Sequence, residues 1–331
     1  MTILIVGGAG YIGSHVNQLL HRSGYSTLVI DNLCRGHREH AQWGKFIQGD
    51  IGNSEFLDHI FTTNKIETVM HFAAFAYVGE SISSPSVYYE NNVSKTLILL
   101  DAMVRHHVNN FIFSSSCATF GNAEYTPIDE LHPQHPINPY GYTKLVVEQI
   151  LKDYDKAYGL KYGIFRYFNA SGADPDRHIG EWHDPETHLI PLILDVAAGI
   201  RPKIDVFGND YDTSDGTCIR DYIHVCDLAE AHKRGMEQLC NTGISDNYNL
   251  GSGKGYSIRE ILHVAQKITK CSIKIHHVAR REGDPAELVG SSEKAKRILG
   301  WTPQYSLEDS ITTAWRWHQK TFQHSPLKRV G

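Results

Sequence analysis

The sequence predicts an α/β fold in which a doubly wound parallel sheet of the Rossmann type is joined to a smaller, mixed α/β C-terminal domain. Short apolar runs alternate with amphipathic stretches through the first half of the chain, as in repeated βα units. A glycine-rich turn, Gly7–Gly13, lies between the first apolar run and the first amphipathic stretch. After about residue 172 the regular alternation gives way to polar loops with helix breakers such as Asp174-Pro175.

The first strand is expected at Ile3–Val6, because this run is short and apolar, and the helix after it carries Ile12, Val16, Leu19 and Leu20 on one face. Further strands are expected at Thr27–Ile30, Phe46–Ile47, Thr68–Phe72, Asn110–Phe113 and Tyr162–Phe165. Helices are expected at Ser54–Thr62, Val87–His106 and Tyr140–Tyr158. The long helices Val87–His106 and Gly141–Tyr158 are apolar on more than one side, so we expect them to pack on the sheet and also on a partner subunit in a homodimer.

The second half mixes short strands with helices in a less regular order. Strands are expected at Ile204–Phe207, Tyr222–Val225, Tyr248–Leu250 and Ile273–His277. Helices are expected at Leu189–Ala198, Cys226–Leu239, Ile258–Thr269 and Leu307–Phe322. We place the domain boundary between residues 171 and 172, and we expect some later segments to return to the first domain.

Composition and charge exclude several classes of protein. The 331 residues are 41% hydrophobic and 21% charged, which supports a sizeable core and argues against global disorder. The net charge of -5, without a basic block, argues against a nucleic-acid partner. No apolar run approaches the ~20 residues that span a bilayer, and Thr2–Val6 begins the chain like a strand, not like a signal peptide. We therefore expect a cytoplasmic protein with no membrane partner.

Cysteine and histidine point to no metal centre. The six cysteines are scattered without a C-x-x-C pair, which fits reduced thiols and a cytosolic address. The 20 histidines are unusually many, but none belongs to an H-E-x-x-H motif or to a His/Cys constellation. We expect most of them on the surface or in loops, and we predict no metal site.

The glycine-rich turn reads Gly7-Gly8-Ala9-Gly10-Tyr11-Ile12-Gly13. Glycine permits the tight turn and lets the backbone approach a pyrophosphate, whose charge the helix N-terminus favours. Asp31 ends the next strand, where a carboxylate binds ribose hydroxyls and repels a 2′-phosphate, so the pattern favours NAD over NADP. The alternative is a structural turn followed by an ordinary loop aspartate.

A second motif places Tyr140 and Lys144 four residues apart, on one face of a predicted helix. An ammonium beside a phenol stabilises the phenolate, so we expect the pKa of Tyr140 to fall from about 10 towards the working pH and the residue to act as a general base. Such a pair also arises by chance. Its position after Ser114-Ser115-Ser116, at the carboxyl end of a strand where doubly wound sheets bind ligands, makes it informative.

These motifs resemble the extended short-chain dehydrogenase/reductase family. The same resemblance is carried by Asp31-Asn32-Leu33, Gly49-Asp50-Ile51, His71-Phe72-Ala73-Ala74 and Asn91-Asn92-Val93. More narrowly, five later segments are similar to the UDP-glucose 4-epimerases of that family: Arg166–Asn169, Phe207–Tyr211, Arg220–Val225, Arg280–Pro285 and Leu299–Trp301. The matches run in order over nearly the whole chain.

The resemblance implies NAD as the cofactor, bound by the domain of residues 1–171. It implies that Phe72, Ala73 and Ala74 line the pyrophosphate channel and that Tyr167 and Phe168 lie beside the nicotinamide. The implied cofactor-binding residues are Gly7, Gly10, Tyr11, Ile12, Gly13, Asp31, Asn32, Asp50, Ile51, Phe72, Ala73, Ala74, Asn91, Ser114, Tyr140, Lys144, Tyr167 and Phe168.

The resemblance also implies an isomerase of galactose metabolism that interconverts UDP-glucose and UDP-galactose through a transient 4-keto sugar and bound NADH. Ser116 would hydrogen-bond the sugar 4-oxygen, Tyr140 would act as the base, and Lys144 would hold the nicotinamide ribose. The domain of residues 172–331 would bind the UDP-sugar. The implied substrate-binding residues are Ser116, Asn169, His188, Leu189, Phe207, Arg220, Arg281 and Asp284.

Several alternatives stay open. The substrate could be UDP-N-acetylglucosamine or a UDP-pentose, since Leu288 aligns with a family position that limits sugar size; a buried strand residue without that role is the competing interpretation. A sugar-nucleotide dehydratase would need an Asp-Glu pair where this chain has Cys117-Ala118-Thr119. A plain dehydrogenase, which would release its oxidised product and NADH, is disfavoured only by the five segments that are similar to the epimerases. A regulator that had kept the fold but lost catalysis would be expected to lack Tyr140 or Lys144, and both are present.

Overall fold

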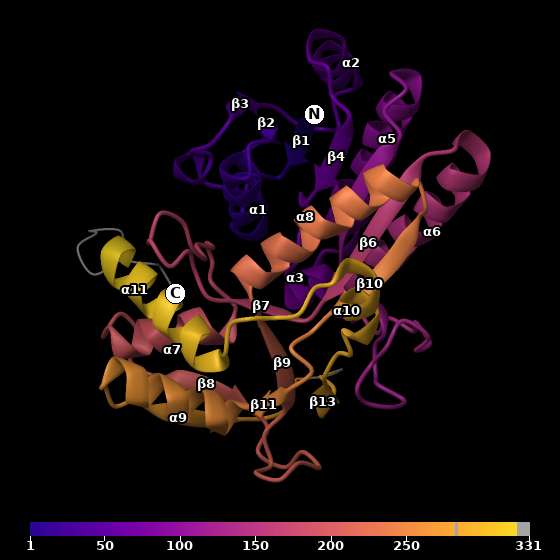
Figure 1. Ribbon diagram of the computed structural model, residues 1–331. Coiled ribbons are helices and arrows are strands. Elements are labelled where there is room, and N and C mark those ends of the chain that lie inside the picture. The colour runs from indigo at the N-terminus through magenta and orange to yellow at the C-terminus, as the bar shows by residue number, and fades with distance from the viewer. Residues whose placement is uncertain (282–283, 323–331) are drawn as a thin grey trace.

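The computed structural model describes residues 1–281 and 284–322, and its centre is a seven-stranded sheet (Figure 1). All six neighbouring strand pairs are parallel, in the order β10-β6-β5-β4-β1-β2-β3. The strands are β1 (Thr2–Val6), β2 (Ser26–Asp31), β3 (Lys45–Gln48), β4 (Thr68–His71), β5 (Asn110–Ser116), β6 (Lys161–Tyr167) and β10 (Asp246–Leu250). The predicted doubly wound fold is confirmed.

Helices cover both faces of this sheet because its central strands are apolar on both sides. In β1, Ile3 and Ile5 point into one core layer, and Leu4 and Val6 point into the other. The helices α1 (Tyr11–Arg22) and α8 (Val225–Thr242) pack on the first face. The second face carries α2 (Ser54–Thr63), α5 (Lys95–Arg105) and α6 (Pro139–Tyr158).

The predicted helix over residues 87–106 is interrupted. It consists of α4 (Pro85–Tyr89), a π-helical turn over Glu90–Ser94, and α5, and a short helix α3 (Val78–Ser83) precedes it. The side chain of Asn92 in the π-turn accepts a hydrogen bond from Phe75 N at 2.8 Å and donates to Thr143 Oγ1 at 3.1 Å. These bonds tie the chain after β4 to α6 and account for the irregular turn.

The second lobe holds two small sheets. In the first, β9 (Ile219–His224) is paired with β7 (Asn169–Ser171), β11 (Gly255–Ser257) and β13 (Glu287–Leu288); in the second, β8 (Ile204–Phe207) pairs with β12 (Ile275–Val278). The helices α7 (Leu189–Ala197), α9 (Ile258–Thr269) and α11 (Leu307–Phe322) contribute to its apolar core. The remaining helix is α10 (Glu293–Leu299), and short 3-10 turns lie at Arg38–His40 and Cys117–Thr119. None of the described helices is both long and apolar enough to cross a membrane.

The chain returns to the first sheet after entering the second lobe. Helix α8 packs against α1, and β10 pairs with β6 at the edge of the seven-stranded sheet, as Figure 1 shows. The boundary between residues 171 and 172 stays a prediction, but the two lobes are joined by more than one crossing of the chain.

Most of the described histidines are at least partly exposed, in line with the expectation, but seven are buried: His15, His40, His71, His132, His224, His232 and His318. Burial disfavours the charged imidazolium, and it lowers the pKa of His71 and of His224 from 6.5 to about 3. The same cause lowers the pKa of His15 and of His232 to about 4, and that of His40 to about 3. These side chains belong to the core as neutral groups.

This burial predicts acid sensitivity. Between pH 6.5 and about 4 the unfolded chain binds protons at these five histidines while the folded chain does not, so the free energy of unfolding falls as the pH falls. Each such group contributes a slope of up to ~1.4 kcal/mol per pH unit. Denaturant titrations at several pH values should give a shallower slope for His232→Phe, and the wild-type slope for His263→Gln on the exposed face of α9. Parallel curves for all three proteins would contradict the prediction.

Candidate active site

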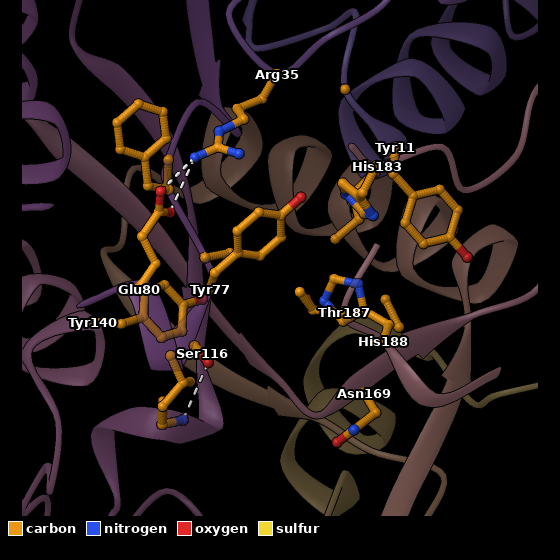
Figure 2. Close-up of a pocket in the computed structure, with 18 of the residues that line it drawn as sticks. Tyr11, Arg35, Tyr77, Glu80, Ser116, Tyr140, Asn169, His183, Thr187 and His188 are labelled. Carbon is orange, nitrogen blue, oxygen red and sulfur yellow. Dashed lines mark hydrogen bonds and ion pairs between the residues drawn. The ribbon is translucent and has the colours of Figure 1, made fainter. Parts of the chain in front are cut away.

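A cleft of about 1310 Å³ lies between the carboxyl ends of the parallel strands and the second lobe (Figure 2). It is lined by every residue for which the sequence implies a role in cofactor binding, substrate binding or catalysis, and also by Leu288. The structure therefore brings the two groups of motifs into one cavity. The particular role of each residue stays a prediction.

The glycine-rich turn leaves no space for side chains at its tightest point. Gly7 has φ of 80°, and a Cβ there would lie 2.5 Å from the backbone nitrogen of Ala73. Asp31 closes the turn from the next strand, since its carboxylate accepts hydrogen bonds from Ala9 N at 3.0 Å and from Leu33 N at 2.9 Å. Burial raises the pKa of Asp31. The start of α1 thus presents bare backbone to the cleft, as a dinucleotide pyrophosphate requires.

Asp50 is held in place by two neighbours. Asn32 donates to Asp50 Oδ2 at 2.8 Å, and Lys95 Nζ lies 2.8 Å from the same oxygen. Although burial raises the pKa of Asp50, the hydrogen bonds that Lys95 and others donate hold it below its usual value. The sequence analysis missed Lys95. It lies one helical turn after Asn91, so the helical period could have indicated it.

The tyrosine and lysine of α6 do lie side by side, but the expected pKa of the tyrosine is wrong. Asn138 caps α6 by accepting from Gly141 N at 2.9 Å, which fixes the first turn that carries Tyr140. Burial raises the pKa of Tyr140 to about 12, against a smaller lowering by its hydrogen bond with Ser116. Burial also lowers the pKa of Lys144 to about 7, and Lys144 Nζ lies 5.9 Å from the Tyr140 ring centroid. In this environment desolvation of the phenolate outweighs any help from the ammonium.

The serine run at the end of β5 orients the same groups. Lys144 Nζ donates to the carbonyl oxygen of Ser114 at 2.7 Å, and the Ser114 hydroxyl is hydrogen-bonded to the hydroxyl of Tyr167. Ser116 Oγ accepts from Ala118 N at 3.1 Å, so this hydroxyl has a fixed position next to Tyr140, as Figure 2 shows. Strand β5 thus positions the side chains of Lys144, Tyr167 and Ser116 in the cleft.

Two arginines line the part of the cleft that the second lobe forms. Arg220 is 9% exposed and forms an ion pair with Asp284, while the Arg281 guanidinium carbon lies 3.8 Å from the ring centroid of Phe207. Guanidinium groups bind diphosphates in a bidentate manner, and the aromatic ring offers a stacking surface. Glu282 and Gly283, within the same predicted motif, lie outside the described residues.

The sequence analysis missed two further pairs of charged residues that line the cleft. Arg35 forms an ion pair with Glu80 at 2.8 Å and lies over the Tyr77 ring at 4.9 Å from the centroid (Figure 2). Its position four residues after Asp31 was the available signal. Glu181 and Glu186 also face the cleft, and both lie within 3.0 Å of Nδ1 of the predicted substrate ligand His188. They sit in an irregular loop for which no periodic pattern exists.

The chain matches the GDP-mannose 4,6-dehydratase family over residues 4–314. It is 50% identical over 323 residues to a UDP-glucose 4-epimerase of Rhizobium leguminosarum bv. trifolii, covering 98% of this chain and 99% of that protein. One crystal structure of UDP-glucose 4-epimerase superposes with a TM-score of 0.95 at 51% identity, covering 97% and 98% of the two chains. The structure of the Brucella ovis UDP-glucose 4-epimerase in complex with NAD superposes with a TM-score of 0.93 at 49% identity, covering 95% and 97%.

Half of the residues are thus identical over nearly the full length of chains that share this fold. The likeness extends through both lobes and across the cleft between them. The chain therefore belongs to the UDP-glucose 4-epimerase family, within the extended short-chain dehydrogenases/reductases.

Proposed function

We propose that this chain is an NAD-dependent isomerase that interconverts UDP-glucose and UDP-galactose. The observation that carries the proposal is the arrangement of one cleft, with Tyr140 and Ser116 at one end and the Arg220 and Arg281 guanidinium groups in the second lobe. Its relatives at about 50% identity are named UDP-glucose 4-epimerase. An enzyme that holds UDP firmly and the sugar loosely is suited to turning the sugar over during the reaction.

The cleft fits NAD at the end formed by the seven-stranded sheet. The turn at Gly7 excludes a Cβ, the N-terminus of α1 faces the cleft, and Asp31, which lines the cleft, would bind the ribose hydroxyls. The pair of Lys95 and Asp50 lies beside Asn32, where the adenosine half would be bound. When bound there, NAD would supply the acceptor for the hydride from C4 of the sugar and, once reduced, the donor for its return to the opposite face.

Tyr140 would take the proton from the sugar 4-hydroxyl and give it back after the sugar has turned over. Ser116, already hydrogen-bonded to Tyr140, would hold the 4-oxygen in line with the phenol. A positive charge beside the phenol favours the phenolate, so the cationic nicotinamide would oppose the effect of burial on the pKa of Tyr140. Lys144, fixed by the Ser114 carbonyl, would hold the ribose and keep the ring in position.

A dehydratase is disfavoured at the same site. Elimination of the 6-hydroxyl requires further acid–base groups, whereas Cys117 and Ala118 follow Ser116 along the cleft wall. Burial also raises the pKa of the Cys117 thiol to about 12, which leaves it a poor base. The two residues that follow Ser116 thus supply no carboxylate for this elimination.

The direct experiment is to incubate the purified protein with UDP-galactose and no added NAD, and to follow UDP-glucose by chromatography. Turnover is expected, because a cofactor regenerated in each cycle can stay bound. Protein shown to contain NAD but unable to convert UDP-galactose would overturn the proposal. Parallel reactions with UDP-N-acetylglucosamine and a UDP-pentose would define the sugar range.

We further propose that Leu288 limits the size of the sugar. It is half-buried in β13, contacts the cluster that contains Phe168, and lines the cleft. Leu288→Tyr is expected to lower kcat/KM for UDP-N-acetylglucosamine about tenfold or more relative to UDP-glucose. Glu287→Gln, at the adjacent position of β13 on the other face, is the control and should keep the wild-type ratio. An unchanged ratio in Leu288→Tyr would assign Leu288 to packing alone.

We also propose a homodimer through the helices of residues 87–106 and 141–158. Val87 and Tyr89 of α4 and Tyr142 and Val146 of α6 are exposed, and the two helices are in contact. A charge in this patch should oppose association, so Tyr142→Glu is expected to sediment as a monomer where the wild type sediments as a dimer. Ile298→Glu is the matched control, because Ile298 is an exposed apolar side chain on α10, outside the patch, and this variant should sediment like the wild type.

The cytoplasmic address is likewise a proposal. It rests on the sequence, in which six cysteines are spread without a C-x-x-C pair. Fractionation of cells that express the chain would test it.

A further inference from the structure

The loop between β7 and α7 gathers four metal-ligating side chains on one wall of the cleft. Glu181, His183, Glu186 and His188 each bring one donor atom into a group whose atoms all lie within 4.8 Å of one another. The Glu181 and Glu186 side chains are 8% and 2% exposed, and that of His183 is 20% exposed. The His188 side chain is 41% exposed, so the group opens to the cleft on that side, and it combines two imidazoles with two carboxylates that are both withdrawn from solvent.

The distances match the edges of a small coordination polyhedron. Nδ1 of His188 lies 2.9 Å from Glu181 Oε1 and 3.0 Å from Glu186 Oε1. Nδ1 of His183 lies 3.3 Å from Glu181 Oε1 and 3.6 Å from Glu186 Oε2. A tetrahedral zinc ion with bonds of ~2.0–2.1 Å has ligand–ligand edges of about 3.3 Å. The four distances lie on both sides of that value, and all four donor atoms lie within 4.8 Å of one another, so small shifts of the side chains would bring them to the edges of such a site.

The surroundings orient the ligands. Thr187 N and His188 N both donate to Glu186 Oε1 at 2.9 Å, which fixes that carboxylate. Trp317 Nε1 donates to the carbonyl oxygen of Glu181 at 3.1 Å, and Trp182 stacks on His37 with ring centroids 4.0 Å apart. Ligands whose positions are supported by a second layer of contacts bind a metal with less loss of conformational entropy.

Charge and ligand type favour a transition metal. Two buried carboxylates carry two negative charges, which one divalent cation neutralises when both imidazoles are neutral ligands. Imidazole nitrogen with carboxylate oxygen suits Zn²⁺ better than Mg²⁺ or Ca²⁺, which prefer oxygen alone. We propose that Glu181, His183, Glu186 and His188 form a zinc-binding site that ties this loop into the wall of the cleft.

The test uses the purified full-length protein, dialysed against Zn²⁺ and then against metal-free buffer, with metal content measured by mass spectrometry. About one zinc per chain is expected, and Tm should rise by about 5 °C at a hundredfold excess of Zn²⁺ over Kd. Both effects should be lost in His183→Gln and in His188→Gln. Neither readout requires a sugar nucleotide, so the result is independent of the proposed activity.

Two histidine variants serve as controls for a chain with many histidines. His276→Gln removes an exposed histidine whose Nδ1 lies 2.7 Å from Asp205 Oδ1, and His178→Gln removes an exposed histidine from a second group, with buried Asp174 and exposed Asp176. Both should retain the zinc and the rise in Tm. If His183→Gln or His188→Gln fails to fold, Glu186→Gln takes its place. Absence of zinc from the wild type, zinc retained by the loop variants, or zinc lost from His178→Gln would each overturn the proposal.

Discussion

Replacing Tyr140 with Phe is expected to lower kcat for the epimerisation by about 10²–10⁴-fold, because the substitution removes the proposed proton acceptor and leaves the ring. The phenol lies in the first turn of α6, hydrogen-bonded to Ser116 and near the Lys144 ammonium. Removing one hydroxyl from this position leaves the Asn138 cap and the Ser114–Lys144 contact in place. The loss should therefore appear in kcat, with NAD content and Tm close to those of the wild type.

The matched control for this experiment is Tyr142→Phe. Tyr142 lies two residues further along the same helix and is 46% exposed, so loss of its hydroxyl should leave kcat unchanged. Turnover of both variants is measured with UDP-galactose, and bound NAD is measured by absorbance after denaturation. If Tyr140→Phe turned over at a rate near that of the wild type, Tyr140 would not be the base.

Gly7→Ala should yield protein with at least about tenfold less bound NAD. A methyl group at this position would lie 2.5 Å from the Ala73 nitrogen and 2.9 Å from the Phe72 carbonyl carbon. Both are backbone atoms, so no change of side-chain rotamer can relieve the contact. The positive φ adds a cost of about 1 kcal/mol for any residue with a Cβ. The turn would have to move out of the position from which its backbone faces the pyrophosphate. NAD content and Tm of the purified variant are the measurements.

Gly24→Ala separates the effect of the positive φ from the effect of the close backbone contact. Gly24 also has a positive φ, of 86°, but a Cβ there would meet nothing within 4 Å. This control should therefore lose a little stability and keep its NAD, whereas Gly7→Ala should lose the cofactor. Equal NAD content in the two variants would show that the close approach at Gly7 does not matter for binding.

Much of the fold could be predicted from the sequence, because the spacing of apolar residues along a helix or strand indicates which of its faces is buried. The helices Ile258–Thr269 and Leu307–Phe322 have the predicted bounds, and Ile204–Phe207 is the predicted strand. These elements have one clear apolar face each, and Ser257 and Glu260 form a capping box at the start of α9. The π-turn at Glu90–Ser94 was not predicted, since it depends on hydrogen bonds of Asn92 with distant segments.

The predicted site residues come together, but their electrostatics could not be derived from spacing. The i and i+4 positions of Tyr140 and Lys144 were predicted correctly, whereas the direction of the Tyr140 pKa shift was not, because burial depends on the whole cleft. Glu181 and Glu186 escaped prediction for a related reason. Their loop has no period, and their proximity to His188 exists only once the loop has folded. Sequence spacing identifies neighbours along a helix, and it says little about the dielectric environment.

Strand β10 makes the seven-stranded sheet depend on a segment from the second half of the chain. It pairs with β6 through residues Asp246–Leu250, although more than seventy residues, which include β7, β8 and β9 of the second lobe and helix α8, separate the two strands. A fragment ending at residue 171 would expose the free edge of β6, a row of unpaired N–H and C=O groups that invites aggregation. The seven-stranded sheet can therefore be completed only after the chain has been synthesised as far as Leu250, and a nascent chain on the ribosome exposes the edge of β6 until β10 has been made.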